Sequence, residues 1–321
     1  MEEILLAGGN ASDGVVRVGS TVRKPWAEST PSVLHYMRAL RAAGIDVPKV
    51  YGQDPQGRQI TEFVPGRLAM DSEPLTPSQL SRAGRLVRSI HDASQAYRPE
   101  TGSTWTPPIA APGAELICHN DLAPWNLLVG DRWVFIDWDA ASPSTRLWDL
   151  AYSAQAFALN DASADLVNAA TNLNAFVDDY GASGELRTAL PAAMRQRTTV
   201  MYKLLKDSHA GAIEPWGTMF ATGHGEHWKA VTEFVENNQS HGHGRWNNPD
   251  WLTTGRGALA YCESASLYRS RAAAKSLICS ALQPSSRSTT AARCTAAEAF
   301  SRSCPSLVSS RTRPRPASES S

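Results

Sequence analysis

Residues 117–139 read ICHNDLAPWNLLVGDRWVFIDWD and combine two apolar runs with four aspartates and three tryptophans. Short apolar runs separated by Gly and Asp predict strands joined by a tight turn. A strand, a polar loop over His119–Trp125 and a hairpin are expected in this order. The expected strands are Leu116–Cys118, Asn126–Val129 and Trp133–Ile136, and Gly130-Asp131 is the expected two-residue hairpin turn.

Three polar side chains gather at the open end of this hairpin. Asp121 and Asn126 lie at the start of the outgoing strand, and Asp137 follows the returning one. Magnesium prefers hard oxygen ligands and usually keeps waters and phosphate oxygens, so Asn126 and Asp137 are suited to hold it. Asp121 is then free to accept the proton of an incoming hydroxyl. The spacing favours phosphoryl transfer, which needs positioning and charge neutralisation more than covalent help.

Residues 1–66 are expected to form a small β-rich unit with one helix. GVVRVGSTVRK, residues 14–24, alternates apolar and polar side chains around a central glycine and predicts a hairpin. STPSVLHYMRALRAAG, residues 29–44, predicts a helix with Ser29 or Thr30 as N-cap and Gly44 at its end. VPKVYGQDPQGRQITEFVPG then predicts strand, turn and strand.

Residues 67–240 are expected to be mainly helical around the hairpin. TPSQLSRAGRLVRSIHDAS, residues 76–94, has apolar residues at helical spacing. Residues 144–205 predict helices broken near Gly181 and Pro191, and EHWKAVTEFVENN predicts a last helix.

Charge is unevenly distributed along the chain. Residues 258–321 hold nine Lys or Arg and three Asp or Glu, which leaves 22 basic and 28 acidic residues before them, a net charge of −6. No apolar run approaches the ~18 residues of a membrane span. The N-terminus lacks the basic and long apolar segments of a signal peptide. A cytoplasmic protein without a membrane partner is expected.

Residues 241–321 are predicted to be a loop followed by a disordered, low-complexity Ser/Ala/Arg tail. The tail holds four of the five cysteines, but without the CxxC pairs of a zinc ribbon. Its basic charge is compatible with contacts to acidic surfaces, although no specific nucleic-acid partner is expected.

The motifs HNDLAPWN and IDWD resemble the catalytic loop and the metal-binding segment of the aminoglycoside phosphotransferase and choline kinase family. The resemblance extends over roughly residues 4–240. It implies an α+β, two-lobed protein-kinase-like fold with a small β-rich N-lobe and a mainly helical C-lobe. It also implies a Mg²⁺-dependent enzyme that moves the γ-phosphoryl group of ATP or GTP to a hydroxyl of a small molecule.

The same resemblance implies roles for individual residues. Asp121 corresponds to the catalytic base, and Asn126 and Asp137 correspond to the metal ligands. His119 corresponds to a structural member of the loop. Asp149, in RLWDLAYSA, matches an aspartate that hydrogen-bonds the catalytic loop from below. Asp139 is a further candidate for contact with substrate or a second metal.

The resemblance also implies a nucleotide site in the first 66 residues. Gly8 and Gly9 are the expected phosphate-covering turn, because glycines let the backbone approach phosphate closely. Lys24 is the expected phosphate contact, with Arg23 as the alternative on the opposite face of the strand. The backbone of a hinge is expected to bind the base. The hinge residues are Glu62, Phe63 and Val64.

One departure from the kinase pattern keeps a second interpretation open. Protein kinases pair the lysine with a helix glutamate, but residues 31–43 contain none. Either Glu28 substitutes, or Lys24 is held otherwise, or nucleotide binding is weak. The alternative function is a non-catalytic pseudokinase, a nucleotide-binding regulatory module.

Overall fold

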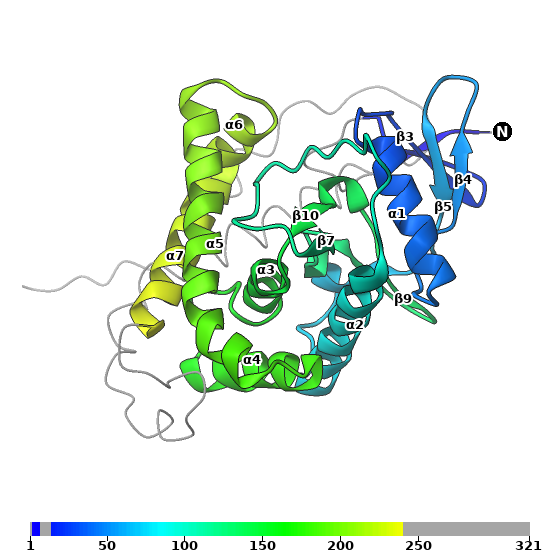
Figure 1. Cartoon of the computed structure of the whole chain (residues 1–321). Coiled ribbons are helices and arrows are strands. Elements are labelled where there is room, and N and C mark those ends of the chain that lie inside the picture. Colours follow the sequence, from blue (N-terminus) through cyan, green and yellow to red (C-terminus); the bar gives the residue numbers. More distant parts are fainter. Residues whose placement is uncertain (1, 7–13, 240–321) are drawn as a thin grey trace, which may run out of the picture. The chain divides into compact units, whose positions relative to one another are not determined.

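The computed structural model describes residues 2–6 and 14–239, all within one compact unit. These residues form an α+β fold in which a β-rich N-terminal lobe precedes a mainly helical C-terminal lobe (Figure 1). This confirms the expected fold class. The glycines expected to cover phosphate, Gly8 and Gly9, and the expected tail over 241–321 lie outside the described residues.

The N-terminal lobe contains a five-stranded antiparallel sheet with the strand order β1-β2-β3-β5-β4. Gly19 has a positive φ of 59° between β2 and β3, so the expected hairpin turns at the glycine. The strands are β1 (Ile4–Leu5), β2 (Val16–Val18), β3 (Thr21–Lys24), β4 (Val50–Gln53) and β5 (Gln59–Glu62).

Helix α1 (Thr30–Ala42) lies beside β4 and β5 (Figure 1). Ser29 occupies the N-cap position but makes no side-chain cap hydrogen bond. The apolar stripe is buried, whereas Arg41 at its end is exposed. Tyr36 donates a hydrogen bond to the Ile117 carbonyl (2.9 Å) and also bonds to Ser94. Because these partners belong to the C-terminal lobe, this buried hydroxyl fixes α1 against it.

The hairpin in the C-terminal lobe differs in detail from the expectation. Strands β8 (Leu127–Val129) and β9 (Trp133–Phe135) pair with Val129 opposite Trp133, so the loop has three residues, 130–132. Arg132 is held in that loop because its guanidinium bonds to Asp46 and Glu62. The outgoing strand begins at Leu127, since Asn126 ends a 3-10 turn, η2 (Pro124–Asn126).

Two further pairings complete the β structure of this lobe. Strand β6 (Arg67–Leu68) adds to the outer side of β8. Strand β7 (Leu116–Cys118), which precedes the polar loop, pairs with β10 (Ser142–Ser144). A 3-10 turn, η3 (Trp138–Ala140), connects the hairpin to β10. Both ends of the polar loop are therefore held by strands.

Helices form the remainder of the C-terminal lobe. One expected break is wrong: α5 continues through Pro191, because Leu190, Ala193 and Met194 are buried and α5 packs against α3 and α7. This packing offsets the one backbone hydrogen bond that proline removes. The helices are α2 (Pro77–Ala96), α3 (Arg146–Ala158), α4 (Leu166–Tyr180), α5 (Gly184–Ala210), α6 (Trp216–Met219) and α7 (Gly225–Gln239).

Helix α3 lies at the centre of the lobe, in contact with α2, α4 and α5 (Figure 1). Most of its residues are buried, including the polar Asp149, Ser153 and Gln155. Thr145 caps its N-terminus by accepting a hydrogen bond from the Trp148 N–H (3.1 Å). Over residues 2–6 and 14–239, no helix has both the length and the apolar character needed to cross a bilayer.

Candidate active site

His119 joins the polar loop to the returning strand of the hairpin. Its Nδ1 accepts a hydrogen bond from the Asp121 N–H (3.3 Å), so Nε2 carries the proton and donates to the Ile136 carbonyl (3.1 Å). The ring is fully buried against Trp138, with centroids 4.4 Å apart. Burial lowers the pKa of His119, which keeps the ring neutral. These contacts hold the His119 ring between the polar loop and the returning strand.

Asn120 sets the direction of the loop, although the sequence did not single it out. Its φ of 63° is left-handed, a conformation that Asn tolerates better than most residues. Its amide Nδ2 donates to Ser142 Oγ (2.8 Å) and to the Ala140 carbonyl (3.2 Å). This turn directs the next side chain, Asp121, toward the helical lobe.

The Asp121 carboxylate accepts three side-chain hydrogen bonds. Tyr152 Oη lies 2.7 Å and Trp125 Nε1 3.3 Å from Oδ1, and Asn126 Nδ2 lies 2.8 Å from Oδ2. Burial disfavours the charged form and raises the pKa of Asp121 to about 6. The hydrogen bond from Tyr152 opposes this change, while the negative charge of Asp137 adds to it. Asp121 is therefore a fixed carboxyl group that ionises just below neutral pH.

Asn126 and Asp137 meet at the open end of the hairpin, as the sequence predicted. The Ile136 N–H donates to the Asn126 carbonyl (2.9 Å), which ties the two segments together. Asp137 itself has a left-handed φ of 60° and is the N-cap residue of η3. The Asn126 amide nitrogen is committed to Asp121, so its Oδ1 is the atom left for another partner.

Lys24 reaches this end of the hairpin from the N-terminal lobe. Its Nζ lies 2.6 Å from Asp137 Oδ1 and 2.7 Å from Asp139 Oδ2. Burial lowers the pKa of Lys24, but the two carboxylates outweigh it and the net shift is upward. Over the described residues no ion pair joins Lys24 to Glu28, which is exposed. Lys24 is therefore held by two aspartates in place of a glutamate.

Arg23 is not a second candidate for the same role. It forms an ion pair with Asp54 (3.5 Å) and donates to Thr21 Oγ1 (2.6 Å). Adjacent residues of a strand point to opposite faces, so Arg23 and Lys24 have separate partners.

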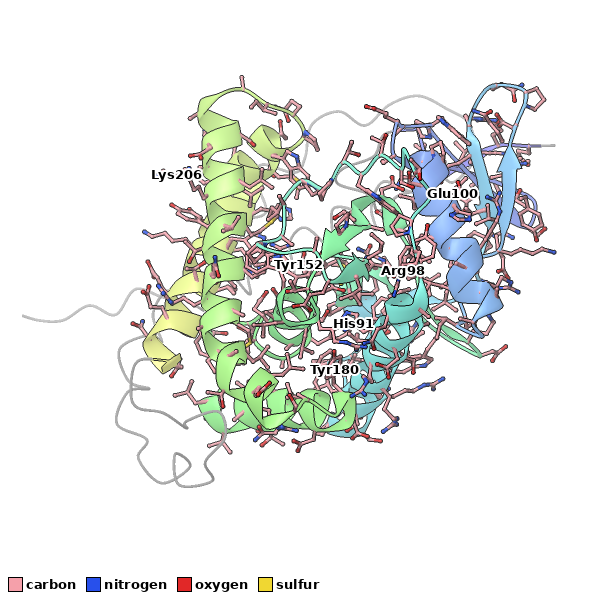
Figure 2. The ribbon with its side chains drawn as sticks, viewed as in Figure 1. His91, Arg98, Glu100, Tyr152, Tyr180 and Lys206 are labelled. Carbon is pink, nitrogen blue, oxygen red and sulfur yellow. The ribbon has the colours of Figure 1, made fainter. Side chains whose placement is uncertain are left out.

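A buried arginine on α5 packs against the ring of Tyr152. The Arg197 guanidinium carbon lies 4.2 Å from the centroid of the Tyr152 ring, and Nη2 donates to the Asn120 carbonyl (3.4 Å). Its Nη1 is buried without a hydrogen-bond partner among the described residues. On the other side, Tyr152 stacks with Trp228 at 6.3 Å. Figure 2 shows Tyr152 on the central helix α3.

Neither Tyr152 nor Arg197 was among the expected site residues. Tyr152 lies three residues after Asp149 on one helix, and this spacing is a usable sequence signal. Arg197 gave no signal, because a single arginine in a helix is usually solvent-exposed.

Asp149 bonds to a different partner from the one expected. Its Oδ2 lies 2.9 Å from His91 Nε2, and the other ring nitrogen of His91 lies 2.8 Å from Tyr180 Oη. Figure 2 shows His91 and Tyr180 at the base of the lobe. The other carboxylate oxygen of Asp149, Oδ1, has no hydrogen-bond partner in the described part of the chain, so Asp149 makes no bond to the catalytic loop. Asp149 instead joins α3 to α2 through a buried pair.

The expected hinge follows β5, but most of its donors are already used. The Glu62 N–H donates to the Lys49 carbonyl (2.8 Å), and the Phe63 N–H donates to the Ser20 carbonyl (2.9 Å). The Glu62 carboxylate accepts from Arg132 Nη1 (2.6 Å). Val64 is buried. Of the three backbone N–H groups, the one at Val64 is therefore best placed to serve a ligand.

The chemistry of these groups suits a divalent cation. Asn126 Oδ1 and the carboxylates of Asp137 and Asp139 are hard oxygen donors that follow the two strands at the open end of the hairpin. The Lys24 ammonium already bridges the two carboxylates, so this point of the structure attracts positive charge. The residues present therefore fit the magnesium ion that the sequence implied.

A β-rich lobe that carries a lysine to aspartates at the end of a hairpin in a helical lobe defines a kinase-like architecture. The family model of the phosphotransferase enzyme family matches residues 4–110 and 103–187. Together these segments span more than half of the 321 residues. The chain therefore belongs to the phosphotransferase enzyme family, and the resemblance inferred from the motifs is confirmed.

One curated protein is similar to part of the chain. The trifolitoxin immunity protein of Rhizobium leguminosarum bv. trifolii is 29% identical over 151 residues, which are 44% of this chain and 57% of that protein. The chain thus spans just over half the length of this curated relative.

Two solved structures share the fold. A microcompartment-associated aminopropanol kinase has a TM-score of 0.54 at 16% identity, covering 74% of this chain and 91% of its own. Amicoumacin kinase hAmiN, in complex with AMP-PNP, Ca²⁺ and Ami, has a TM-score of 0.53 at 12% identity, covering 73% and 88%.

Proposed function

We propose that this protein transfers the γ-phosphoryl group of ATP or GTP to a hydroxyl of a small molecule, with Mg²⁺ as cofactor. The observation that carries the proposal is the convergence of Asp121, Asn126 and Asp137 at one end of the hairpin, with Lys24 beside them. The family membership supports the reaction class.

In the proposed reaction, Asp121 accepts the hydroxyl proton as the acceptor oxygen bonds to the γ-phosphorus. The bond from this phosphorus to the bridging oxygen breaks, and a nucleoside diphosphate leaves. Tyr152 and Trp125 hold the Asp121 carboxylate in one orientation, which matters because phosphoryl transfer depends on alignment.

Asn126 and Asp137 would hold the magnesium ion, with Asp139 as a further carboxylate for substrate or a second ion. When bound, magnesium neutralises the phosphate oxygens on which charge develops. Lys24 would exchange one of its aspartate partners for phosphate, and the backbone at the hinge would bind the base. Val64 offers the donor that Glu62 and Phe63 do not.

The test is release of nucleoside diphosphate by the full chain with Mg²⁺ and either ATP or GTP. The acceptor panel should include amino alcohols such as aminopropanol, aminoglycosides, amicoumacin and trifolitoxin, since similar proteins are named for some of these. Asp121→Asn should abolish turnover. Asp131→Asn, an exposed aspartate in the hairpin loop, is the matched control and should retain it. Turnover by Asp121→Asn at the wild-type rate would refute Asp121 as the base.

The alternative is a non-catalytic module that binds a nucleotide or a small molecule. The lack of a glutamate on α1 to pair with Lys24 favours it, since protein kinases use that pair in the active arrangement. The two functions differ in thermal shift and turnover: a module that binds nucleotide is stabilised without any turnover. Absence of stabilisation by ATP, GTP or either with Mg²⁺ would contradict both the enzyme and the nucleotide-binding module.

A further inference from the structure

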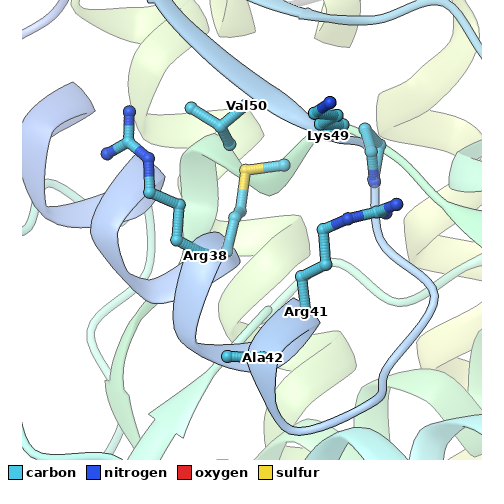
Figure 3. A pocket seen from close by; sticks show the side chains of 7 residues that line it. Arg38, Arg41, Ala42, Lys49 and Val50 are labelled. Carbon is cyan, nitrogen blue, oxygen red and sulfur yellow. The ribbon is translucent and has the colours of Figure 1, made fainter.

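A hollow outside the candidate active site lies between α1 and the start of β4. It has a volume of about 310 Å³, which is at the lower end of the range for small-molecule sites. Arg38 and Arg41 border it from α1, and Lys49 and Val50 border it from the strand side (Figure 3). None of the residues lining it belongs to the group around Asp121.

The rim of the hollow carries three positively charged side chains, Arg38, Arg41 and Lys49. In the described part of the chain, neither Arg38 nor Lys49 forms an ion pair. Arg41 Nη1 donates to the Val47 carbonyl (2.9 Å), and Lys49 Nζ lies 5.2 Å from the Tyr51 ring centroid. Because all three side chains border one hollow, an anion bound there would be attracted by each of them.

The acidic side chains of this segment, Glu62 and Asp46, are bonded to Arg132 and not to the rim. The carboxylate of Glu62 is close enough to Arg41 for the charges to interact, but it is bonded to Arg132 Nη1 (2.6 Å) and to the Lys49 backbone N–H (3.0 Å). Asp46, the other acid in this segment, is paired with the same Arg132. The rim therefore stays cationic on a protein body that is net acidic.

The floor of the hollow is apolar. Met37 is 3% exposed, Pro48 is buried and Val50 is half-buried. Charged rims around apolar floors select ligands that have both an anionic and an apolar part.

We propose that this hollow binds an organic phosphate, with its phosphate against Arg38, Arg41 and Lys49 and its apolar part on Met37 and Val50. Guanidinium forks match phosphate oxygens in pairs, and the two negative charges of a phosphate monoester balance most of the rim. The site is separate from the proposed nucleotide site and does not depend on the proposed function.

Phenyl phosphate, inorganic phosphate and phenol are suitable probes for the full chain. The methyl group of Met37, one of six methionines, reports occupancy by NMR after ¹³C-methyl labelling and assignment with Met37→Leu. Phenyl phosphate is expected to shift the Met37 methyl signal saturably. Inorganic phosphate is expected to bind at least about threefold more weakly than phenyl phosphate, because it leaves the apolar floor uncovered.

The localising variant is Arg38→Gln/Lys49→Gln, which should weaken phenyl phosphate binding about tenfold or more. Arg98→Gln/Lys206→Gln removes the same charge from other exposed positions, which Figure 2 labels, and should bind like the wild type. Mg²⁺ and AMP-PNP are present throughout, so that they compete with phenyl phosphate for the proposed nucleotide site at Lys24.

Each outcome decides the inference. An unshifted Met37 signal up to about 10 mM phenyl phosphate, or equal binding by the wild type and Arg38→Gln/Lys49→Gln, overturns it. If phenol binds as tightly as phenyl phosphate, the inference is also overturned, since the site would then recognise only the apolar part. Loss of nucleotide binding or turnover bears on the proposed function alone, because the Met37 readout is local to the hollow.

Discussion

Lys24 Nζ lies 2.6 Å from Asp137 Oδ1, although the two residues are 113 positions apart in the chain. The same ammonium lies 2.7 Å from Asp139 Oδ2. One cation of the N-terminal lobe therefore holds both carboxylates that follow the hairpin in the C-terminal lobe. In the proposed function a metal ion and a triphosphate would share these partners, which would couple the binding of metal and nucleotide to the position of the lysine.

Removal of the lysine charge should separate metal binding from nucleotide binding. In Lys24→Met, Mn²⁺ or Mg²⁺ alone should bind at least about threefold more tightly, because the ammonium no longer competes for Asp137 and Asp139. Affinity for the metal–nucleotide complex should fall, because a phosphate contact is lost. Titration calorimetry with and without AMP-PNP measures both. Lys206→Met, an exposed site on α5, should change neither; a weaker metal affinity in Lys24→Met would contradict the coupling.

Tyr152 should act on the orientation of Asp121 rather than on nucleotide affinity. Tyr152→Phe removes the hydroxyl that donates to Asp121 at 2.7 Å and should lower kcat about tenfold or more, the usual value of a hydrogen bond to a charged group. The nucleotide KM should stay within about twofold. Tyr202→Phe is the matched control, since no hydrogen bond of the Tyr202 hydroxyl occurs in the described part of the chain. An unchanged kcat in Tyr152→Phe would remove this positioning role.

The pH dependence of kcat/KM should show an acid limb set by Asp121. Burial raises the pKa of Asp121 to about 6, and only the ionised carboxylate accepts a proton. Activity should therefore be full above this pKa and should fall about tenfold per pH unit below it. In the wild type the hydrogen bond from Tyr152 lowers the pKa of Asp121. Tyr152→Phe removes this bond, so the pKa should rise and the acid limb should move to higher pH. A wild-type profile that is flat down to about pH 4.5 would contradict this assignment.

The close approach of α2 and α4 should make Gly84 sensitive to substitution. A Cβ at this position would lie 2.2 Å from the Phe176 carbonyl oxygen, which is backbone and cannot rotate away. Gly84→Ala should lower the free energy of unfolding by about 1–3 kcal/mol despite the better helix propensity of alanine. Gly184→Ala, at the start of α5 with nothing within 4 Å, should be neutral or stabilising. Urea unfolding measures both, and equal stabilities would contradict the packing.

Much of the site was visible in the sequence because its residues lie on one hairpin. Asp121, Asn126 and Asp137 flank two short strands, so local pairing alone brings them to one end. The turn length was mistaken because the third loop residue, Arg132, is held by Asp46 and Glu62 from a distant part of the chain. The break expected at Pro191 was wrong for a similar reason, since burial against α3 and α7 maintains α5.

The sequence by itself determined a β-rich segment followed by a helical one, the hairpin and the three residues at its open end, because short-range spacing and apolar alternation specify them. The two-lobed class followed from the resemblance of its motifs. Only the tertiary structure decided the partners of Lys24, Asp121 and Asp149. Lys24 pairs with aspartates, and Asp149 bonds to His91. Asp121 accepts a hydrogen bond from Tyr152, whose ring packs against the Arg197 guanidinium. These contacts join elements that are far apart in the chain, and the packing of α3 among its neighbouring helices determines which polar groups are buried together.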